Sequence, residues 1–407
     1  MRAHPPLCRL IYCLLALPAV LMAPPAAAQA GPSLADAVEA AWQRSPQAAA
    51  LVARQGESLA GRESARSWIA GAPVLGLAQR SDRWSERRGE RETEISLSAP
   101  VWLPAQKATR AALADANATE LDAQSAAARL ALAGEVRAKL WEVAAAREKM
   151  AEKRDHQHHL EELADEVARR VRAGDLARSD GLLARQEVLA AQSDVAAAAG
   201  QAAQALAGFR TLTGLADIPK PEPEPIAEPA PPRLHPRLAA AARATQRAQA
   251  ALALAGANRN PPPTLGISAR RERDGSGGAA SSLGFAVQIP FGGASLNRPL
   301  EAGAHTQVAS SAAELAQAGA AIESDIALAR EQLTLVDGAL QTASARAVLT
   351  REHARLIEKA FRLGERGLAD LLRAHVLAHE ADMAERQQRV ALGLAHAQLN
   401  QALGIIP

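Results

Sequence analysis

The chain has 407 residues, and its 46 Lys and Arg against 44 Asp and Glu leave a formal net charge of +2. This balance, without a clustered basic patch, gives no basis for nucleic-acid binding. Aromatic residues are only 2% of the sequence and alanine dominates long stretches. That composition is typical of long, closely packed helices and argues against two ordinary globular domains.

Residues 1–30 are predicted to be a signal peptide. Arg2 and Arg9 precede an apolar run over residues 10–22, and small residues that fit a cleavage site follow. The run is too short for a membrane anchor. Both cysteines lie in this segment, and neither follows the small-residue pair of a lipid-attachment site. We therefore expect an exported protein without lipid anchor, disulfide or thiolate metal site.

The rest of the sequence matches itself when it is shifted by about 190 residues, which indicates that one large unit was duplicated. The matched positions include Pro100 with Pro290, Gly174 with Gly364, Asp180 with Asp370, and Gly214 with Gly404. We predict a first repeat over residues 31–214, a proline-rich linker over 215–236 and a second repeat over 237–407.

Each repeat is predicted to contain a helix, a β-hairpin, a very long helix, a tight turn and a further long helix. In the first repeat these are expected at about 47–70, 73–101, 104–171, 172–175 and 176–213. In the second, the hairpin is expected at about 263–290, the long helix at 299–361, the turn at 362–366 and the last helix at 367–403. Pro104 and Pro299 are each expected in a first helical turn, with Asn297 as the cap of the second long helix. A helix of nearly 70 residues is roughly 100 Å long, for which a globular domain has no room.

The hairpin segments alternate between apolar and small or polar residues, as in Leu283, Phe285 and Val287 against Ser282 and Gly284. A hairpin on a globular core is the ordinary explanation, but no separate core exists here. The alternative is strands of a membrane β-barrel, apolar outside and polar inside. Because lipid tolerates no open sheet edge, several chains must then pool their strands. Three chains give twelve strands and a water-filled lumen, and two give eight strands with a filled interior.

Between the repeats, residues 219–236 contain eight prolines, some of which alternate with glutamate. This composition predicts an extended linker. The favoured interpretation is a spacer with no binding role.

Three segments resemble the TolC family of outer-membrane efflux ducts, and the resemblance covers essentially all of the chain after residue 30. Residues 33–46 resemble the family's opening helix and its Asn-Pro step, although Ser45 and His235 replace the asparagine in the two repeats. Residues 290–293 resemble the family's Pro-x-Phe-x-Gly step from strand to helix, for which the first repeat has a weaker match at 100–103. The turn motif Gly-x5-Asp-x-Leu-x-Ala occurs at 174–184 and again at 364–374.

This resemblance implies a fold that is mainly α with a small β part. It implies a homotrimer whose twelve-stranded barrel lies in the outer-membrane lipid and continues into a coiled-coil tunnel across the periplasm. It also implies a periplasmic adaptor and an inner-membrane pump of the RND type as partners, without a cofactor. Residues 104–107 and 297–299 look like the cation-efflux branch. A periplasmic adaptor or scaffold is the alternative, but an adaptor has one helical hairpin and flanking β domains. No enzyme motif is found, so we expect no catalytic activity.

The two turns carry the candidate site residues. Gly174 and Gly364 stand where a long helix must reverse, and glycine supplies the left-handed conformation needed there. The resemblance implies that these turns, with Asp180 and Asp370, form the tip where the adaptor docks. Compensation of a helix dipole is the alternative explanation and fits both aspartates. The resemblance further implies that Asp370, repeated three times, lines the pore constriction and favours cations, although Arg373 replaces a second acidic residue that the family can carry.

Histidines form the most metal-like pattern in the chain. Helical spacing puts Asp155 beside His158 and His159, and His156 beside His159, while His375 and His379 form a second pair four residues apart. The favoured interpretation of both groups is a solvated polar face of a coiled coil, and we expect no resident metal.

Overall fold

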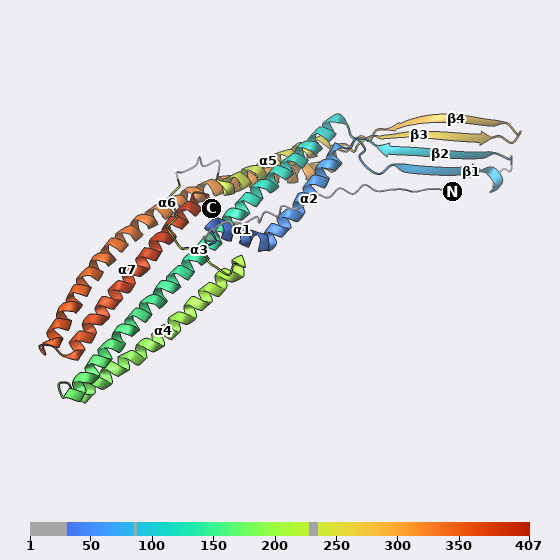
Figure 1. The fold of residues 1–407 in the computed structure, drawn as a ribbon. Coiled ribbons are helices and arrows are strands. Elements are labelled where there is room, and N and C mark those ends of the chain that lie inside the picture. Colours follow the sequence, from blue (N-terminus) through green and yellow to red (C-terminus); the bar gives the residue numbers. More distant parts are fainter. Residues whose placement is uncertain (1–30, 85–87, 228–234) are drawn as a thin grey trace, which may run out of the picture.

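The computed structural model describes residues 31–84, 88–227 and 235–407, so the predicted signal peptide lies outside the described residues. Four strands extend from one end of the molecule, and two long helical hairpins run to the opposite end (Figure 1). The predicted fold class, mainly α with four strands, is confirmed.

The first half contains two short helices, a β-hairpin and a helical hairpin. Its elements are α1 (Leu34–Arg44), α2 (Pro46–Arg66), β1 (Val74–Ser81), a 3₁₀ turn (Asp82–Trp84), β2 (Arg91–Pro100), α3 (Pro104–Ala173) and α4 (Arg178–Thr213). Ser33 and Asp36 form a capping box at the start of α1, and Pro104 begins α3 as expected. The predicted helix over 47–70 ends earlier, at Arg66. Ile69 instead forms an isolated β-bridge with Val101, so the chain is extended and not helical at this position.

The second half has the same order of elements after the linker. They are α5 (Pro236–Ala257), β3 (Thr264–Arg273), β4 (Ala279–Gln288), α6 (Ala294–Arg362) and α7 (Leu368–Ala402). The predicted start of the long helix was wrong, because Pro299 lies inside α6 and Gly293 is the residue before its first turn. Asn297 is therefore no cap. Its buried amide donates to the carbonyl of Ala255 at 2.7 Å and so ties α6 to α5.

The four strands form one antiparallel sheet in the order β1-β2-β3-β4. Its register places apolar residues opposite one another through the whole sheet. One row across the strands is Leu75, Leu97, Ile267 and Phe285. The neighbouring row, on the other face, is Gly76, Ser96, Ser268 and Gly284. The hairpins of the two halves thus join through β2 and β3 into one continuous surface.

The helices are arranged around the two longest ones. Helix α3 contacts α2 and α4, helix α6 contacts α5 and α7, and α3 also contacts α5 and α7. Small side chains make this close packing possible, since alanines supply more than half of the buried apolar positions among the described residues. Within the described residues, no helix is both long enough and apolar enough to cross a membrane.

Both helical turns lie at the same end, away from the sheet (Figure 1). An apolar cluster just behind the turns joins all four long helices. It contains Leu160 and Val167 of α3, Ala184 of α4, Phe361 of α6 and Leu371 of α7. The Arg170 guanidinium also donates to the carbonyl of Phe361 at 3.3 Å. The first and second hairpins are therefore fastened to each other near their ends.

The linker is more than a spacer, which corrects the favoured interpretation from the sequence. Its residues 219–227 run along the helices, while 228–234 lie outside the described residues. The Glu224 carboxylate binds the buried Arg137 guanidinium of α3. Asn400 of α7 accepts from the Ala227 amide at 3.1 Å and donates to the Pro225 carbonyl at 2.9 Å. The linker thus fastens α7 to α3 rather than only connecting the two halves.

Candidate functional site

The sheet turns its apolar face outward. Leu283 is 90% exposed, and the same face carries further exposed side chains, namely Leu75, Leu77, Ile95, Leu97, Ile267, Phe285 and Val287. A water-soluble sheet normally buries such a face against a core. An exposed apolar surface of this kind marks a face that another apolar medium or molecule covers.

The opposite face of the sheet carries small and polar residues. A Cβ atom added at Gly76 or Gly284 would touch the hydroxyl group of Ser96 or Ser268 unless that serine rotated, so the side chains on this face are closely spaced. Farther along the strands, Glu92 is 17% exposed and pairs with Arg270 at 2.9 Å. On the central strands β2 and β3 the small and polar side chains are half-buried and the apolar ones are exposed, so the predicted alternation is present with the apolar side outward.

Strands β1 and β4 are the edges of the sheet. In the described part of the chain, each pairs with a neighbour on one side only. Each edge therefore presents unpaired backbone groups along eight to ten residues. Such edges are templates for strands of another chain, and they cannot remain unpaired in lipid.

The outer helices of the two hairpins carry exposed leucines at heptad spacing. On α6 and its last turn these are Leu328, Leu335, Leu349, Leu356 and Leu363, and on α4 they are Leu182 and Leu189. A repeat of seven is the pattern of a helix that packs in a coiled coil. By contrast, Leu160, Leu163 and Val167 of α3 are buried within the chain. The exposed stripes on α4 and α6 therefore lack a partner helix among the described residues.

The structure places Gly174 and Gly364 at the predicted turns. Their φ angles are 90° and 77°, in the left-handed region that favours glycine. A Cβ atom added at either position would have no heavy atom within 4 Å, so the surroundings are open and only the backbone conformation restricts the residue. Both turns are exposed, as a docking surface requires.

Asp180 and Asp370 occupy equivalent positions but have different contacts. The Asp180 carboxylate accepts a hydrogen bond from the Ala177 backbone amide at 3.3 Å and so caps the start of α4. The Asp370 carboxylate lies 3.6 Å from the Arg366 guanidinium, and 53% of its side chain is exposed. Asp180 is therefore engaged at its own helix terminus, whereas the Asp370 carboxylate is available to solvent.

The two histidine groups meet across the interface of α3 and α7, which the sequence interpretation missed. The rings of His156 and His379 stack with centroids 3.7 Å apart. Nitrogen atoms of His159 and His375 approach to 3.1 Å. All four rings are half-buried, so the expected solvated face was wrong for them, and only His158 points to solvent. No group of three or more potential ligands is arranged to hold a metal ion in residues 31–84, 88–227 and 235–407.

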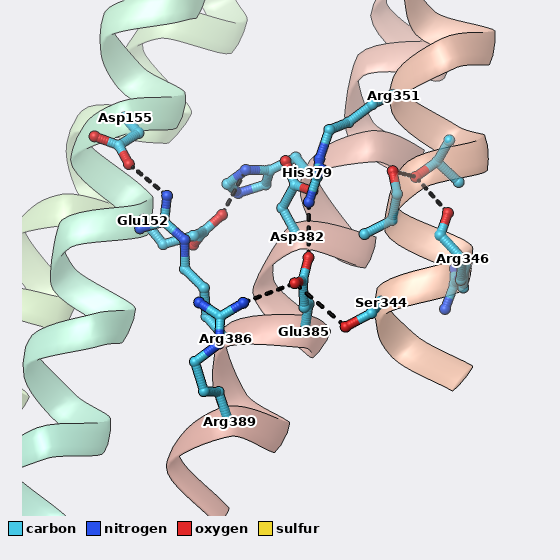
Figure 2. A network of polar contacts seen from close by, with 12 residues as sticks. Glu152, Asp155, Ser344, Arg346, Arg351, His379, Asp382, Glu385, Arg386 and Arg389 are labelled. Atoms are coloured by element: carbon cyan, nitrogen blue, oxygen red, sulfur yellow. Dashed lines mark hydrogen bonds and ion pairs between the residues drawn. The ribbon is translucent and has the colours of Figure 1, made fainter. Parts of the chain in front are cut away.

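Glu152 completes this histidine cluster. Its carboxylate is 3% exposed and lies 2.5 Å from Nδ1 of His379 (Figure 2). Burial raises the pKa of Glu152 to about 7, against the opposing effect of Lys153 and Arg386. Burial also lowers the pKa of His379 to about 3 and that of His375 to about 4, and the neighbouring imidazoles add to the effect. The cluster therefore favours uncharged side chains.

A signal for Glu152 was present in the sequence. Glu152, His156 and His159 follow one another at spacings of four and three, which puts them on one face of a helix. The pairing with α7 had no such signal, because the partners are more than 200 positions apart in the chain. The sequence likewise contained no signal for the Arg137–Glu224 pair, because the helix and the linker that it joins have no sequence pattern in common.

Comparison with known proteins rests on structure alone, because no protein family and no characterised protein matches the sequence. The outer membrane protein VceC of Vibrio cholerae has a TM-score of 0.72 at 16% identity, over 91% of this chain and 96% of its own. The outer membrane channel MtrE of Neisseria gonorrhoeae, in its open state, has a TM-score of 0.69 at 19% identity, over 92% and 89%. The outer membrane channel CmeC of Campylobacter jejuni has a TM-score of 0.71 at 13% identity, over 91% and 85%. The chain has the fold of these outer-membrane proteins, as its resemblance to the TolC family predicted.

Proposed function

We propose that this chain is one subunit of a trimeric outer-membrane efflux duct that conducts its substrate passively and performs no chemistry. Three copies would join their sheets into a twelve-stranded barrel and their helices into a periplasmic tunnel. The outward apolar face of the sheet is the observation that carries the proposal. A face of this kind around a polar interior is the arrangement of a membrane barrel.

The sheet edges support the assembly of several copies. Four strands have two open edges, and lipid does not tolerate them. Pairing of β1 in one copy with β4 in the next satisfies both edges at once and, repeated around an axis, closes a ring. Closure by three copies gives a lumen wide enough for water, whereas closure by two would fill the interior with side chains.

The helices support the same arrangement. Along the helical part of one chain, α4 and α6 are the outer helices, because α3 and α7 contact each other between them. Each outer helix carries an exposed leucine stripe. We propose that α6 of one copy packs against α4 of the next, so that the stripes cover each other as in a coiled coil.

The partners follow from this placement. With the sheet in the outer membrane, the turns at Gly174 and Gly364 would reach into the periplasm. There they would meet an adaptor protein, which connects the duct to an inner-membrane pump of the RND type that supplies the energy. A signal peptide over residues 1–30, removed on export and without lipid attachment, is part of the same proposal.

A periplasmic adaptor or scaffold is the competing function. The likeness to outer-membrane channels over nine-tenths of the chain favours the duct. So does the presence of two long helical hairpins in each chain.

The test is the location and size of the mature protein. We expect it in the outer-membrane fraction and, after extraction in a mild detergent, at three times the chain mass in light scattering corrected for detergent. A conductance in planar bilayers, absent after heat dissociation of the trimer, would show the lumen. A monomer in the soluble periplasmic fraction would contradict the proposal.

A further inference from the structure

The two helical hairpins of one chain meet along α3 and α7, and imidazoles occupy the middle of this contact. We call His156 and His159 of α3, with His375 and His379 of α7, the histidine seam. One pair stacks at 3.7 Å between ring centroids with an angle of 17° between the planes. The other pair approaches at 3.1 Å between Nε2 of His159 and Nδ1 of His375.

We propose that the histidine seam is an acid-sensitive joint, in which neutral imidazoles hold α7 against α3 and their protonation drives the two hairpins apart. The joint is a property of the single chain and does not depend on the proposed channel function. Along α3 and α7 the histidine seam lies between two apolar clusters, the one behind the turns and the one that contains Trp141 and Ala397.

The geometry of both pairs is lost when both rings of a pair carry a positive charge. A neutral imidazole has one donor and one acceptor nitrogen, so His159 and His375 can share one proton across 3.1 Å. When both rings are protonated, every ring nitrogen is a donor and this hydrogen bond is lost. The stacked rings of His156 and His379 would likewise bring two positive charges face to face in a half-buried contact, where repulsion is stronger than in water.

Cations already surround the seam and would resist further positive charge. Lys153 lies on α3 beside the rings, and it lowers the pKa of both His156 and His379. The remaining cations are Arg351 and Arg355 of α6 and Arg386 of α7. Protonation of the histidines thus places further positive charge beside these cations.

Most nearby carboxylates are engaged with these cations and cannot fully compensate. Asp155 of α3 binds Arg386 at 2.9 Å, and Asp382 of α7 binds Arg351 at 2.7 Å (Figure 2). Asp194 of α4 binds Lys153 at 2.8 Å. Glu358 of α6 pairs with Arg362 on its own helix. Among the carboxylates of the described residues, only Glu152 lies within ion-pair distance of an imidazole of the seam.

The direction of the pH effect follows from the pKa shifts. Burial lowers the pKa of His156, His375 and His379, so the closed seam binds protons more weakly than an open one and loses stability as the pH falls below 6.5. Burial raises the pKa of Glu152 to about 7, so its contribution is present at low pH and is lost as the pH rises through 7. Glu152 thus opposes the histidines from about pH 7 down to its ordinary pKa of 4.5, but it is one group against three. The histidines therefore dominate below about pH 6.

The size of the effect can be bounded for His375. If an open seam restores its ordinary pKa of 6.5 from about 4, acidification below both values favours opening by at most roughly 300-fold. Partial exposure of the ring to solvent reduces this factor. A closed joint at neutral pH that opens between about pH 6 and pH 4 is the expected behaviour.

The experiment measures the distance between α3 and α7 in the full chain. Residues 31–407 contain no cysteine, so Arg154→Cys on α3 with Glu380→Cys on α7 gives two unique, exposed sites for spin labels. Labelled chains diluted with unlabelled ones report the distance within one chain by double electron–electron resonance. We expect a single short distance at pH 7.5 and a growing longer population between pH 6 and pH 4.

The variant that tests the seam replaces all four histidines by glutamine and should show the same distance at every pH. His158→Gln is the matched control, because His158 belongs to the same helix but is exposed, and it should respond like the wild type. A wild-type distance that does not change down to pH 4 would overturn the proposal. A quadruple variant that responds like the wild type would do so too, because the response would then arise from carboxylates.

A second measurement does not depend on the folding of that variant. Carbon-13-labelled histidine in the wild-type protein gives the pKa of each ring by NMR, with single His→Gln variants for assignment. We expect His375 and His379 to titrate below pH 5. If His375 and His379 instead had the ordinary histidine pKa, the joint would not hold them neutral, and the proposal would be wrong.

Discussion

The guanidinium of Arg137 binds both carboxylate oxygens of Glu224, with Nε–Oε1 at 2.8 Å and Nη2–Oε2 at 2.7 Å. The Arg137 side chain is only 3% exposed. Its remaining donors reach Oε1 of Gln401 at 2.7 Å and the carbonyl of Ile405 at 3.0 Å. One buried cation thus joins the long helix of the first half, the linker, and the end of the second half.

Replacement of Glu224 by alanine should destabilise this junction by about 3 kcal/mol. The loss of one partner leaves a buried charge uncompensated, which typically costs about 3–5 kcal/mol. The contacts to Gln401 and Ile405 remain and keep the cost at the lower end of that range. The free energy of unfolding, from denaturant titration followed by circular dichroism, measures the effect.

Glu222→Ala is the matched control for that experiment. Glu222 lies in the same linker and pairs with Lys220, but both side chains are exposed. Its loss should change the stability by at most about 0.5 kcal/mol. Equal destabilisation by the two substitutions would show that the linker acts through its conformation and not through Arg137.

Gly393→Ala should destabilise the contact between α7 and α3. A Cβ atom at residue 393 would overlap the indole ring of Trp141, which is buried and cannot easily move away. Overpacking of this kind costs about 1–3 kcal/mol, measured as a lower midpoint of thermal unfolding. The double variant with Trp141→Phe should recover part of the loss, and Gly56→Ala, in open space on α2, should be neutral or slightly stabilising. An unchanged midpoint in Gly393→Ala would mean that the two helices do not approach this closely.

Much of the fold was predictable because local patterns determine it. The alternation in the strands specifies which face is apolar, and the register then aligns Leu77 with Ile95 and Ala269 with Leu283. Gly174 and Gly364 end the long helices because their backbone conformation favours glycine. Where a local signal was ambiguous, the boundary was wrong. Pro299 fits a first turn by preference, yet α6 begins five residues earlier, since Asn297 bonds to α5.

The candidate sites were less predictable because they depend on contacts between distant segments. A polar helix face such as that of His156 is solvated unless another helix covers it, and the sequence around residue 156 does not specify that helix. The contact with His379 follows only from the packing of α3 against α7. The linker is similar: its prolines predict an extended backbone, but its attachment depends on Arg137 far from it in the chain.

Leu283→Arg should impair membrane insertion, because Leu283 lies near the middle of β4 on the exposed apolar face. An arginine that faces lipid near the midplane costs about 2–4 kcal/mol. Ser282→Arg adds the same side chain one residue away on the polar face and should be tolerated, because its neighbour Arg270 is already paired with Glu92. The fraction of folded protein recovered in the outer membrane measures both. Similar losses for the two variants would argue that the sheet does not face lipid.

The double substitution Gly174→Val with Gly364→Val should abolish adaptor cross-linking and efflux while trimer yield and insertion stay near normal. Left-handed backbone costs a β-branched residue about 1–2 kcal/mol at each turn, and the sheet lies at the far end of helices about 100 Å long. The change to asparagine at both positions is the control, since asparagine tolerates this conformation and the space around both turns is open. A double valine variant that pumps and cross-links like the wild type would show that the turns only connect helices.

Asp370→Ala should alter the cation preference of the channel, and Asp180→Ala should not. The Asp370 carboxylate is half exposed and lies 3.6 Å from Arg366, so its charge can act on passing ions. The Asp180 carboxylate instead accepts from the Ala177 amide, and its loss should cost α4 about 1 kcal/mol of stability. Reversal potentials in planar bilayers under a salt gradient measure the preference, and thermal unfolding measures the stability. Because the two aspartates follow equivalent turns, each variant is the control for the other. If Asp370→Ala left the reversal potential unchanged, or if Asp180→Ala shifted it as much, the pore assignment of Asp370 would be wrong, and both residues would serve only the starts of their helices.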